Sequence, residues 1–316
     1  MNLEPLTDVR RRTGFPRLAA CLAVAVVLGL VVSAPAAAQM VMNSVDHLTF
    51  DRPESWALKY FTSATLLAGL ETPRTQKPGS VSIGIEGGWL PPLSDAQQMV
   101  GYDGTEAQDL NKAPFIPRVR VSIGLPARLS LVVAAVPPFS MFGLKPRLLA
   151  VALERPVYES SALAVGVRFY GQIGTVEGAY TCPADVATLP AGSAGNPEGC
   201  LTASSDTASL RYLGGEGSVA FRPDNRLSPH LGAGLSYMDA GFQVDALTFG
   251  MIDHTHYLSH GTVFSASGGV SYRLTDKLML GVDVFYSPLS VTRGFGVPVQ
   301  NDGLFNIRTL LTYRMR

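Results

Sequence analysis

Hydrophobic and polar residues alternate along most of the chain with a period of two, the side-chain period of a β-strand. The final stretch, FNIRTLLTYRMR, places Phe305 and Ile307 on one side and Asn306 and Arg308 on the other. Successive side chains of a strand point to opposite faces, so these two faces meet different surroundings. The alternation therefore predicts strands that separate an apolar medium from a polar one.

The same pattern recurs in ten segments that we expect to be strands. They are 79–90, 116–124, 129–137, 146–154, 161–178, 207–222, 227–244, 257–274, 277–292 and 303–316. Short connections, at 125–130, 154–161, 222–228 and 273–277, alternate with longer ones, at 91–115, 137–146, 182–200, 248–256 and 293–303. Short turns at one end and long loops at the other are typical of a transmembrane β-barrel.

The N-terminal part is open to two interpretations. Residues 56–73 also alternate and predict an eleventh strand, and 44–50 would supply a twelfth and restore the even number of bacterial barrels. Alternatively, Asp51 caps a short helix with Pro53 in its first turn, and the segment is a plug or arm on a ten-stranded barrel. We expect about 12 strands, with ten as the alternative.

Composition agrees with a membrane protein of this kind. Charged residues make up 16% of the chain and the mean hydropathy is +0.19, whereas soluble domains carry about 25% charged residues. Beyond the N-terminus, no apolar run reaches the roughly 20 residues of a spanning helix. The predicted fold class is therefore all-β, an antiparallel transmembrane β-barrel.

The first residues predict export. Four arginines at positions 10, 11, 12 and 17 precede an apolar run at 18–32, and APAAAQ offers cleavage after Ala38. We expect a signal peptide at 1–38, an N-terminal arm or short strand at 39–55, and a barrel domain at 56–316. Cleavage leaves 21 Lys and Arg against 23 Asp and Glu, which gives no basic footprint for nucleic acid.

Two cysteines remain after cleavage, Cys182 and Cys200. They flank a segment rich in Pro, Gly and Ala that predicts a long loop. In an oxidising compartment the pair predicts one disulfide, although two free thiols are the alternative.

The polar face of the strands carries charges of both signs, which we expect to line the lumen. They are Glu86, Arg120, Arg168, Glu216, Asp283 and Arg308. Because strands that follow one another in the chain lie side by side, we expect Glu86 near Arg120 and Arg168 near Glu216. A charge held away from water needs a partner of opposite sign. One interpretation is a structural ion-pair network, and the other is an arginine-lined constriction that selects anions.

The segment DHTHYLSH, at 253–260, is the one stretch with metal or catalytic character. Asp253, His254 and His256 are weak metal candidates, since imidazole and carboxylate suit a divalent ion. His256 with Ser259 is a weak candidate pair for lipid hydrolysis. The ordinary explanation is that polar residues occur where a loop meets a strand.

Taken together, the signal peptide, the alternating strands, turns such as RLTDK and the aromatic-bearing last strand resemble bacterial outer-membrane β-barrel proteins. The resemblance implies contact with outer-membrane lipid and insertion by the barrel-assembly machinery. Those chains commonly end in an aromatic residue, whereas here Arg314, Met315 and Arg316 follow Tyr313.

From this we expect a passive channel or transporter for small solutes, anionic ones included, with no cofactor and no enzymatic activity. The first alternative is a non-conducting barrel that acts through the disulfide loop. The second is a lipid-modifying enzyme of the outer membrane.

Overall fold

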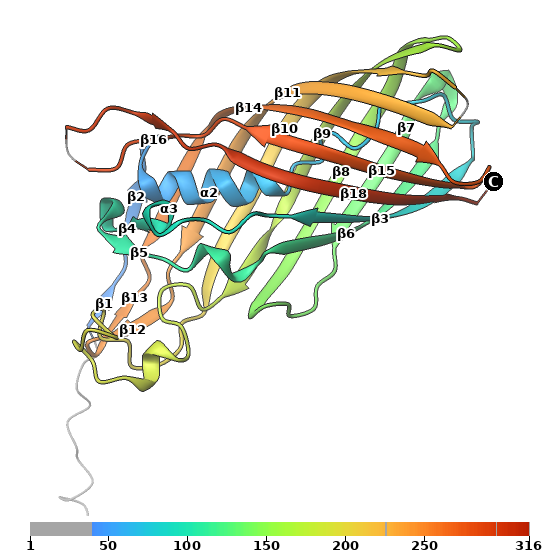
Figure 1. Cartoon of the computed structure of the whole chain (residues 1–316). Coiled ribbons are helices and arrows are strands. Elements are labelled where there is room, and N and C mark those ends of the chain that lie inside the picture. Colours follow the sequence, from blue (N-terminus) through green and yellow to red (C-terminus); the bar gives the residue numbers. More distant parts are fainter. Residues whose placement is uncertain (1–39, 225, 295, 316) are drawn as a thin grey trace, which may run out of the picture. The chain divides into compact units, whose positions relative to one another are not determined.

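The computed structural model describes residues 40–315 apart from 225 and 295. The expected signal peptide and its cleavage site lie outside the described residues. Within the described part of the chain, ten antiparallel strands form a closed barrel (Figure 1). Each strand pairs with its neighbour in the chain, and β18 pairs with β3 to close the ring.

The strands of the barrel have the following bounds. They are β3 (Val81–Trp89), β6 (Phe115–Gly124), β7 (Ser130–Val136), β8 (Leu144–Glu159), β9 (Leu163–Gly178), β10 (Asp206–Phe221), β11 (Leu227–Gln243), β14 (His256–Arg273), β15 (Leu278–Ser287) and β18 (Leu304–Arg314). These match the ten segments predicted from the alternation, so the count lies at the lower end of the expected range of 10 to 12.

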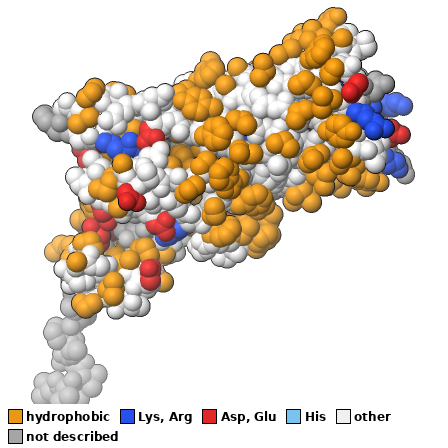
Figure 2. All heavy atoms as spheres, in the orientation of Figure 1, with side chains coloured by type: hydrophobic (Ala, Val, Ile, Leu, Met, Phe, Trp, Pro, Cys, Tyr) orange, Lys and Arg blue, Asp and Glu red, His pale blue; other side chains and the backbone are white. Residues whose placement is uncertain are grey.

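The two faces of the wall differ as the alternation predicts. Phe169 is 65% exposed on the outside, whereas the adjacent Arg168 is 1% exposed and points inward. Figure 2 shows apolar side chains over the outside of the barrel, with charged side chains gathered toward its ends. An apolar outer band with charges at its rims is the surface of a barrel that spans a bilayer. None of the described helices is long and apolar enough to cross a membrane.

The prediction of a strand at 56–73 is wrong. Residues Pro53–Ala64 form the helix α2, and the chain continues through the barrel without strand pairing as far as β3. Because α2 is surrounded by the barrel wall, side chains on all its sides are buried, including Trp56, Leu58 and Thr62. A helix buried all round has no apolar stripe of period 3.6, so its sequence could not be told from an alternating strand.

The chain enters the barrel from the end with the long loops. β1 (Val41–Met42) and β2 (Val45–His47) pair in parallel with β13 (Met251–Asp253) and β14. The predicted N-terminal strand at 44–50 is thus a three-residue strand outside the ring. The alternative of a helix on a ten-stranded barrel describes the structure, but Arg52 is the N-cap residue, and Asp51 instead accepts a hydrogen bond from Thr292.

The connections follow the predicted order of short and long. Smaller elements occupy them: α3 (Asp95–Gln98), β4 (Met99–Gly101), η1 (Tyr102–Gly104), β5 (Glu106–Ala107), η2 (Leu110–Lys112), η3 (Pro126–Arg128), η4 (Val186–Thr188), β12 (Ala246–Thr248), β16 (Ser290–Val291) and β17 (Gln300–Asn301). Apart from η3, which lies in a short turn, they all belong to the end of the barrel at which the N-terminal segment enters.

Candidate functional site

Buried arginines of the barrel wall hold the segment that fills the lumen, residues 53–78, which we call the plug. Arg308 on β18 donates from Nη1 to the carbonyl oxygens of Leu66 (2.8 Å) and Ala68 (3.0 Å), and from Nη2 to Ser63 (3.1 Å). The last carbonyls of a helix lack partners within the helix. Arg308 therefore binds the Ser63 carbonyl in the last turn of α2 together with two carbonyls of the chain that follows the helix.

A second arginine joins the wall charges to the plug. Arg168 donates from Nε to Glu154 (2.6 Å) and from Nη1 to Glu216 (2.9 Å). It also donates to the carbonyl oxygens of Gly69 (2.9 Å) and Glu71 (3.1 Å). Its side chain is almost fully buried, and the two carboxylates compensate its charge.

The carboxylates of the wall bind backbone N–H groups of the plug. Glu216 accepts from the Gly69 amide at 3.0 and 3.1 Å, and Asp283 accepts from the Leu70 amide at 2.6 Å. Both residues have a positive φ, 74° at Gly69 and 72° at Leu70. Consecutive amides in turn conformations make a concavity that suits anions, and here two carboxylates occupy it. Asp283 also contacts the imidazole of His230 at 3.0 Å.

Glu86 forms the third charged group of the lumen. Its carboxylate lies 2.9 Å from Arg120 Nε and 3.8 Å from Arg118 Nη1. Arg118 in turn donates to the carbonyl oxygen of Thr65 in the plug. Arg118 therefore links the Glu86 carboxylate to the plug.

All six residues that the sequence singled out are buried and face the interior. Sequence reasoning missed the plug, whose backbone binds four of them, because a backbone carbonyl or amide leaves no side-chain signal. It also missed Tyr212, which donates to the carbonyl oxygen of Thr65 at 2.8 Å and accepts from the amide of Leu67 at 3.0 Å. Pro53 followed by Glu54 was the available sign of a helix start.

The predicted disulfide between Cys182 and Cys200 is confirmed, with the two Cα atoms 5.6 Å apart. Asn196 stabilises the enclosed loop, because its side chain donates to the carbonyl oxygens of Leu189 (3.0 Å) and Cys200 (2.9 Å).

The candidates at 253–260 do not come together. The described residues contain no group of three His, Cys, Asp or Glu that could hold a metal ion, and the His254 ring lies instead 3.5 Å from Asp245. His256 and Ser259 are three residues apart on β14, so they face opposite sides of the wall. The structure contains no hydrogen bond between them, and they do not form a nucleophile and base pair.

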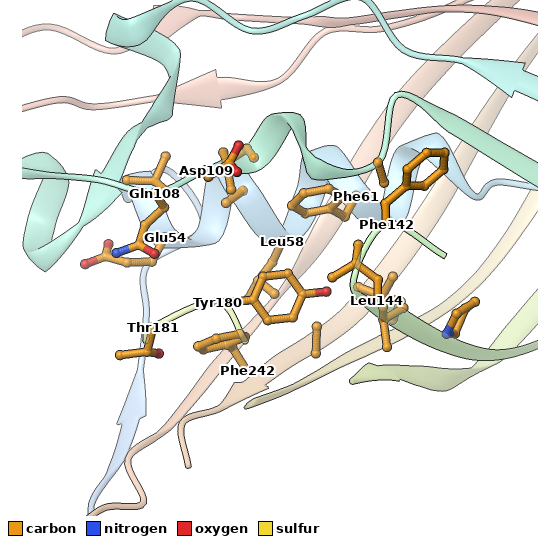
Figure 3. A pocket seen from close by; sticks show the side chains of 18 of the residues that line it. Glu54, Leu58, Phe61, Gln108, Asp109, Phe142, Leu144, Tyr180, Thr181 and Phe242 are labelled. Atoms are coloured by element: carbon orange, nitrogen blue, oxygen red, sulfur yellow. The ribbon is translucent and has the colours of Figure 1, made fainter. Parts of the chain in front are cut away.

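An apolar pocket of about 200 Å³ lies at the long-loop end of the barrel, between the plug and the wall. Figure 3 shows Leu58 and Phe61 of α2 on one side and Leu144 and Phe242 of the wall on the other. Further aliphatic lining comes from Val100, Leu110, Ile116, Val136, Leu148, Val176, Ala208, Leu210 and Val244. The segments that meet here are far apart in the sequence, so no local sequence motif predicts the pocket.

The charged residues that line the pocket are all acidic, and they lie at its rim, since none of them is buried. They are Glu54, Glu106, Asp109 and Asp253. Burial and the neighbouring Glu198 carboxylate raise the pKa of Glu106 to about 7. Lys112, a nearby cation, donates to the carbonyl oxygen of Ala179 at 2.8 Å. The pocket therefore offers a large apolar wall and an acidic rim, with no cationic side chain among its lining residues.

No protein-family model and no curated protein matches the sequence. Among solved structures, the fold is similar to an outer-membrane channel from Pseudomonas putida F1, with 10% identity, 78% of this chain and 100% of that chain covered, and a TM-score of 0.38.

The fold is also similar to the outer-membrane protease OmpT from Escherichia coli (9% identity, 75% and 94% covered, TM-score 0.35) and to Neisserial surface protein A (12%, 75% and 96%, 0.30). All three are outer-membrane or surface proteins with different names and tasks, so what this chain does has to be inferred from its own residues.

Proposed function

We propose that the protein is an outer-membrane transporter for a small apolar molecule, which binds in the pocket between the plug and the wall. The observation that carries this proposal is the apolar lining of an unfilled cavity inside a barrel whose wall, farther along the same strands, binds the plug through buried charges. Small-molecule sites are concave and mostly apolar, with a few polar groups that fix orientation. We further propose that the long-loop end faces the cell exterior, as in outer-membrane barrels generally.

The inward faces of single strands support a dedicated site. On β10, Ala208 and Leu210 line the pocket, whereas Glu216, farther along the same inward face, binds the plug. On β8, Leu144 and Leu148 line the pocket, whereas Glu154 pairs with Arg168. The inward face of each strand therefore changes from apolar to charged at the level where the pocket ends and the charged contacts with the plug begin.

An uncharged solute fits this arrangement better than an anion. The guanidinium groups of Arg168 and Arg308 already donate to the plug backbone and to wall carboxylates, so they do not offer a site for an anion. The rim of the pocket is acidic and would repel one. The cavity has room for on the order of 15 water-sized groups, enough for a medium-length acyl chain or a pair of rings. Passage beyond the pocket requires the plug to move.

Photoaffinity labelling tests the binding step. Purified protein is exposed to decanol that carries a diazirine, irradiated, and digested for mass spectrometry. We expect label on peptides that contain Leu58, Leu148 and Leu210. Leu210→Trp, which fills the cavity, is expected to abolish that labelling.

Leu213→Trp is the matched control, because Leu213 lies on the same strand but is 70% exposed on the outside, whereas Leu210 is 3% exposed. Labelling that is equal in all three proteins, or confined to the outer surface, would contradict a binding site inside the barrel.

A further inference from the structure

On one side of the pocket, the strand β7 ends before its two neighbours in the barrel wall do. β7 spans seven residues, Ser130–Val136, whereas the next strand, β8, spans sixteen. Pairing of β7 with β6 ends at Val119 and Ala135, and pairing with β8 ends at Val136 and Leu148. Toward the long-loop end, β6 and β8 continue without a strand between them.

Four prolines explain why the pairing stops there. If the register between β7 and β6 is continued past its last pair, Pro137 lies opposite Pro117. If the register between β7 and β8 is continued in the same way, Pro138 lies opposite Pro146. Proline has no N–H group to donate to the ladder and is tolerated at strand edges rather than in central strands. Both ladders therefore end at the same height of the wall.

The result is a notch bounded by residues 115–118 of β6 and 144–147 of β8. Neighbouring strands lie about 4.8 Å apart, so the loss of one strand separates the two edges by roughly 10 Å of backbone. Only the loop 137–143 spans the notch. Both edges keep a partner on their far side, β3 for β6 and β9 for β8.

Side chains at the notch line the pocket and are also exposed on the outside of the barrel. Phe115 and Phe142 both line the pocket, yet they are 44% and 55% exposed. Elsewhere in the wall a side chain faces one side only, as Leu210 and Leu213 illustrate. The loop also exposes Phe139, and aromatic rings at this level of a barrel are characteristic of the membrane interface.

We infer that the pocket opens sideways through this notch into the outer leaflet, so that its ligand is a membrane-dissolved apolar molecule exchanged with lipid rather than with water. This inference rests on the proposed function, because it assigns the ligand's source. The acidic rim faces the loops, whereas the notch carries the exposed rings of Phe115 and Phe142. On the outer side of its β8 edge, Lys145 and Arg147 lie 3.9 and 3.1 Å from Glu177, and charged residues of this kind beside aromatic rings suit the level of the lipid headgroups, where a membrane-dissolved molecule would enter.

The test restores the missing ladder. The variant Pro117→Val, Pro137→Thr, Pro138→Val, Pro146→Thr regains the backbone donors that β7 needs to extend between its neighbours. Wild type and variant are reconstituted in vesicles that carry the diazirine decanol in the lipid, and pocket labelling is followed over time. We expect labelling of the variant to slow several-fold, with the same final extent.

Pro156→Thr is the control, because Pro156 lies on the same strand and the same inward face as Pro146 but at the short-turn end. It is expected to label at the wild-type rate. An unchanged rate in the four-proline variant would overturn the lateral route, whereas absence of label from the pocket of the wild type would overturn the proposed function instead.

A second variant covers the case in which the ladder does not re-form. Phe142→Cys is modified with a bulky maleimide, and Tyr158→Cys, exposed at the other end of β8, is modified as its control. Cys182 and Cys200 are held in the disulfide and do not react, and Cys21 is removed with residues 1–38 from both variants. We expect slower labelling only when position 142 is modified, and equal rates for the two modified proteins would argue against the notch.

Discussion

The guanidinium of Arg308 donates a hydrogen bond to the carbonyl oxygen of Leu66 at 2.8 Å, across 242 positions of the chain. This contact joins the last strand of the barrel to the plug that enters before the first. Breaking it without a substitute leaves a buried charge unpaired, which is costly away from water. The plug is therefore held in place by the wall rather than simply packed inside it.

Arg308→Ala is expected to loosen the plug. Removing Arg308 leaves the buried carbonyl oxygens of Ser63, Leu66 and Ala68 without this donor, and a buried polar group left unsatisfied costs about 1–3 kcal/mol. In single-channel recordings from planar bilayers we expect the wild type to be closed and the variant to show openings. Arg314→Ala, on the exposed end of the same strand, is the control and should stay closed. Steady conductance by the wild type would contradict a closed plug.

Gly69→Ala is expected to destabilise the protein more than Gly79→Ala. Both glycines have a positive φ, 74° and 79°, which costs an L-residue roughly 1–2 kcal/mol. A Cβ atom at Gly69 would lie 3.1 Å from Ser267 Oγ and 3.2 Å from Asp283 Oδ2, whereas at Gly79 it would meet nothing within 4 Å. The free energy of unfolding in urea, measured for both variants, separates the cost of backbone strain from the cost of crowding. Equal losses of unfolding free energy would show that the plug shifts here to make room for the added methyl group.

Arg168→Ala is expected to cost about 3–5 kcal/mol, because it leaves the Glu154 and Glu216 carboxylates uncompensated in the lumen. Adding Glu154→Gln and Glu216→Gln should recover part of this loss in the free energy of unfolding. Arg222→Ala serves as control, since its pair with Glu159 is partly exposed and worth about 0–1 kcal/mol. A triple variant less stable than Arg168→Ala would show that the carboxylates matter chiefly as acceptors for Gly69.

The stability of the protein is expected to depend on pH through Glu106. Its pKa is raised to about 7, so the folded protein binds a proton more tightly than the unfolded chain does. The unfolding free energy should therefore fall as pH rises from about 4.5 to 7. Because Glu106 is partly exposed, we expect less than about 1 kcal/mol. Thermal unfolding at several pH values should show this slope in the wild type and lose it in Glu106→Gln.

A Glu198→Gln variant provides a check on the cause. Removing that carboxylate should bring the pKa of Glu106 toward its ordinary value and flatten the slope without touching Glu106 itself. A slope unchanged in Glu198→Gln would assign the effect to burial alone.

The sequence by itself determined the barrel wall. Side chains of a strand alternate, and a membrane on one side and a polar lumen on the other demand different residues at each step, so Ile83, Ile85 and Glu86 reveal their faces without a structure. The same regularity located all ten strands, although β8 extends beyond the predicted 146–154 and β15 ends at Ser287 rather than at 292. Two cysteines around a loop in a chain expected to be exported predicted the disulfide.

Only the tertiary structure decided what fills the barrel. α2 is enclosed on all sides, so its sequence lacks the one-sided pattern that identifies a helix. The groups of the plug that Arg168 and Arg308 bind are backbone carbonyls, which every residue possesses. The pocket is assembled by Leu58, Leu144 and Phe242 from segments distant in the chain. The local periodicity of the sequence shows whether a residue faces lipid or the lumen. Which residue it contacts there depends on the distant segment that lies beside it once the barrel has closed.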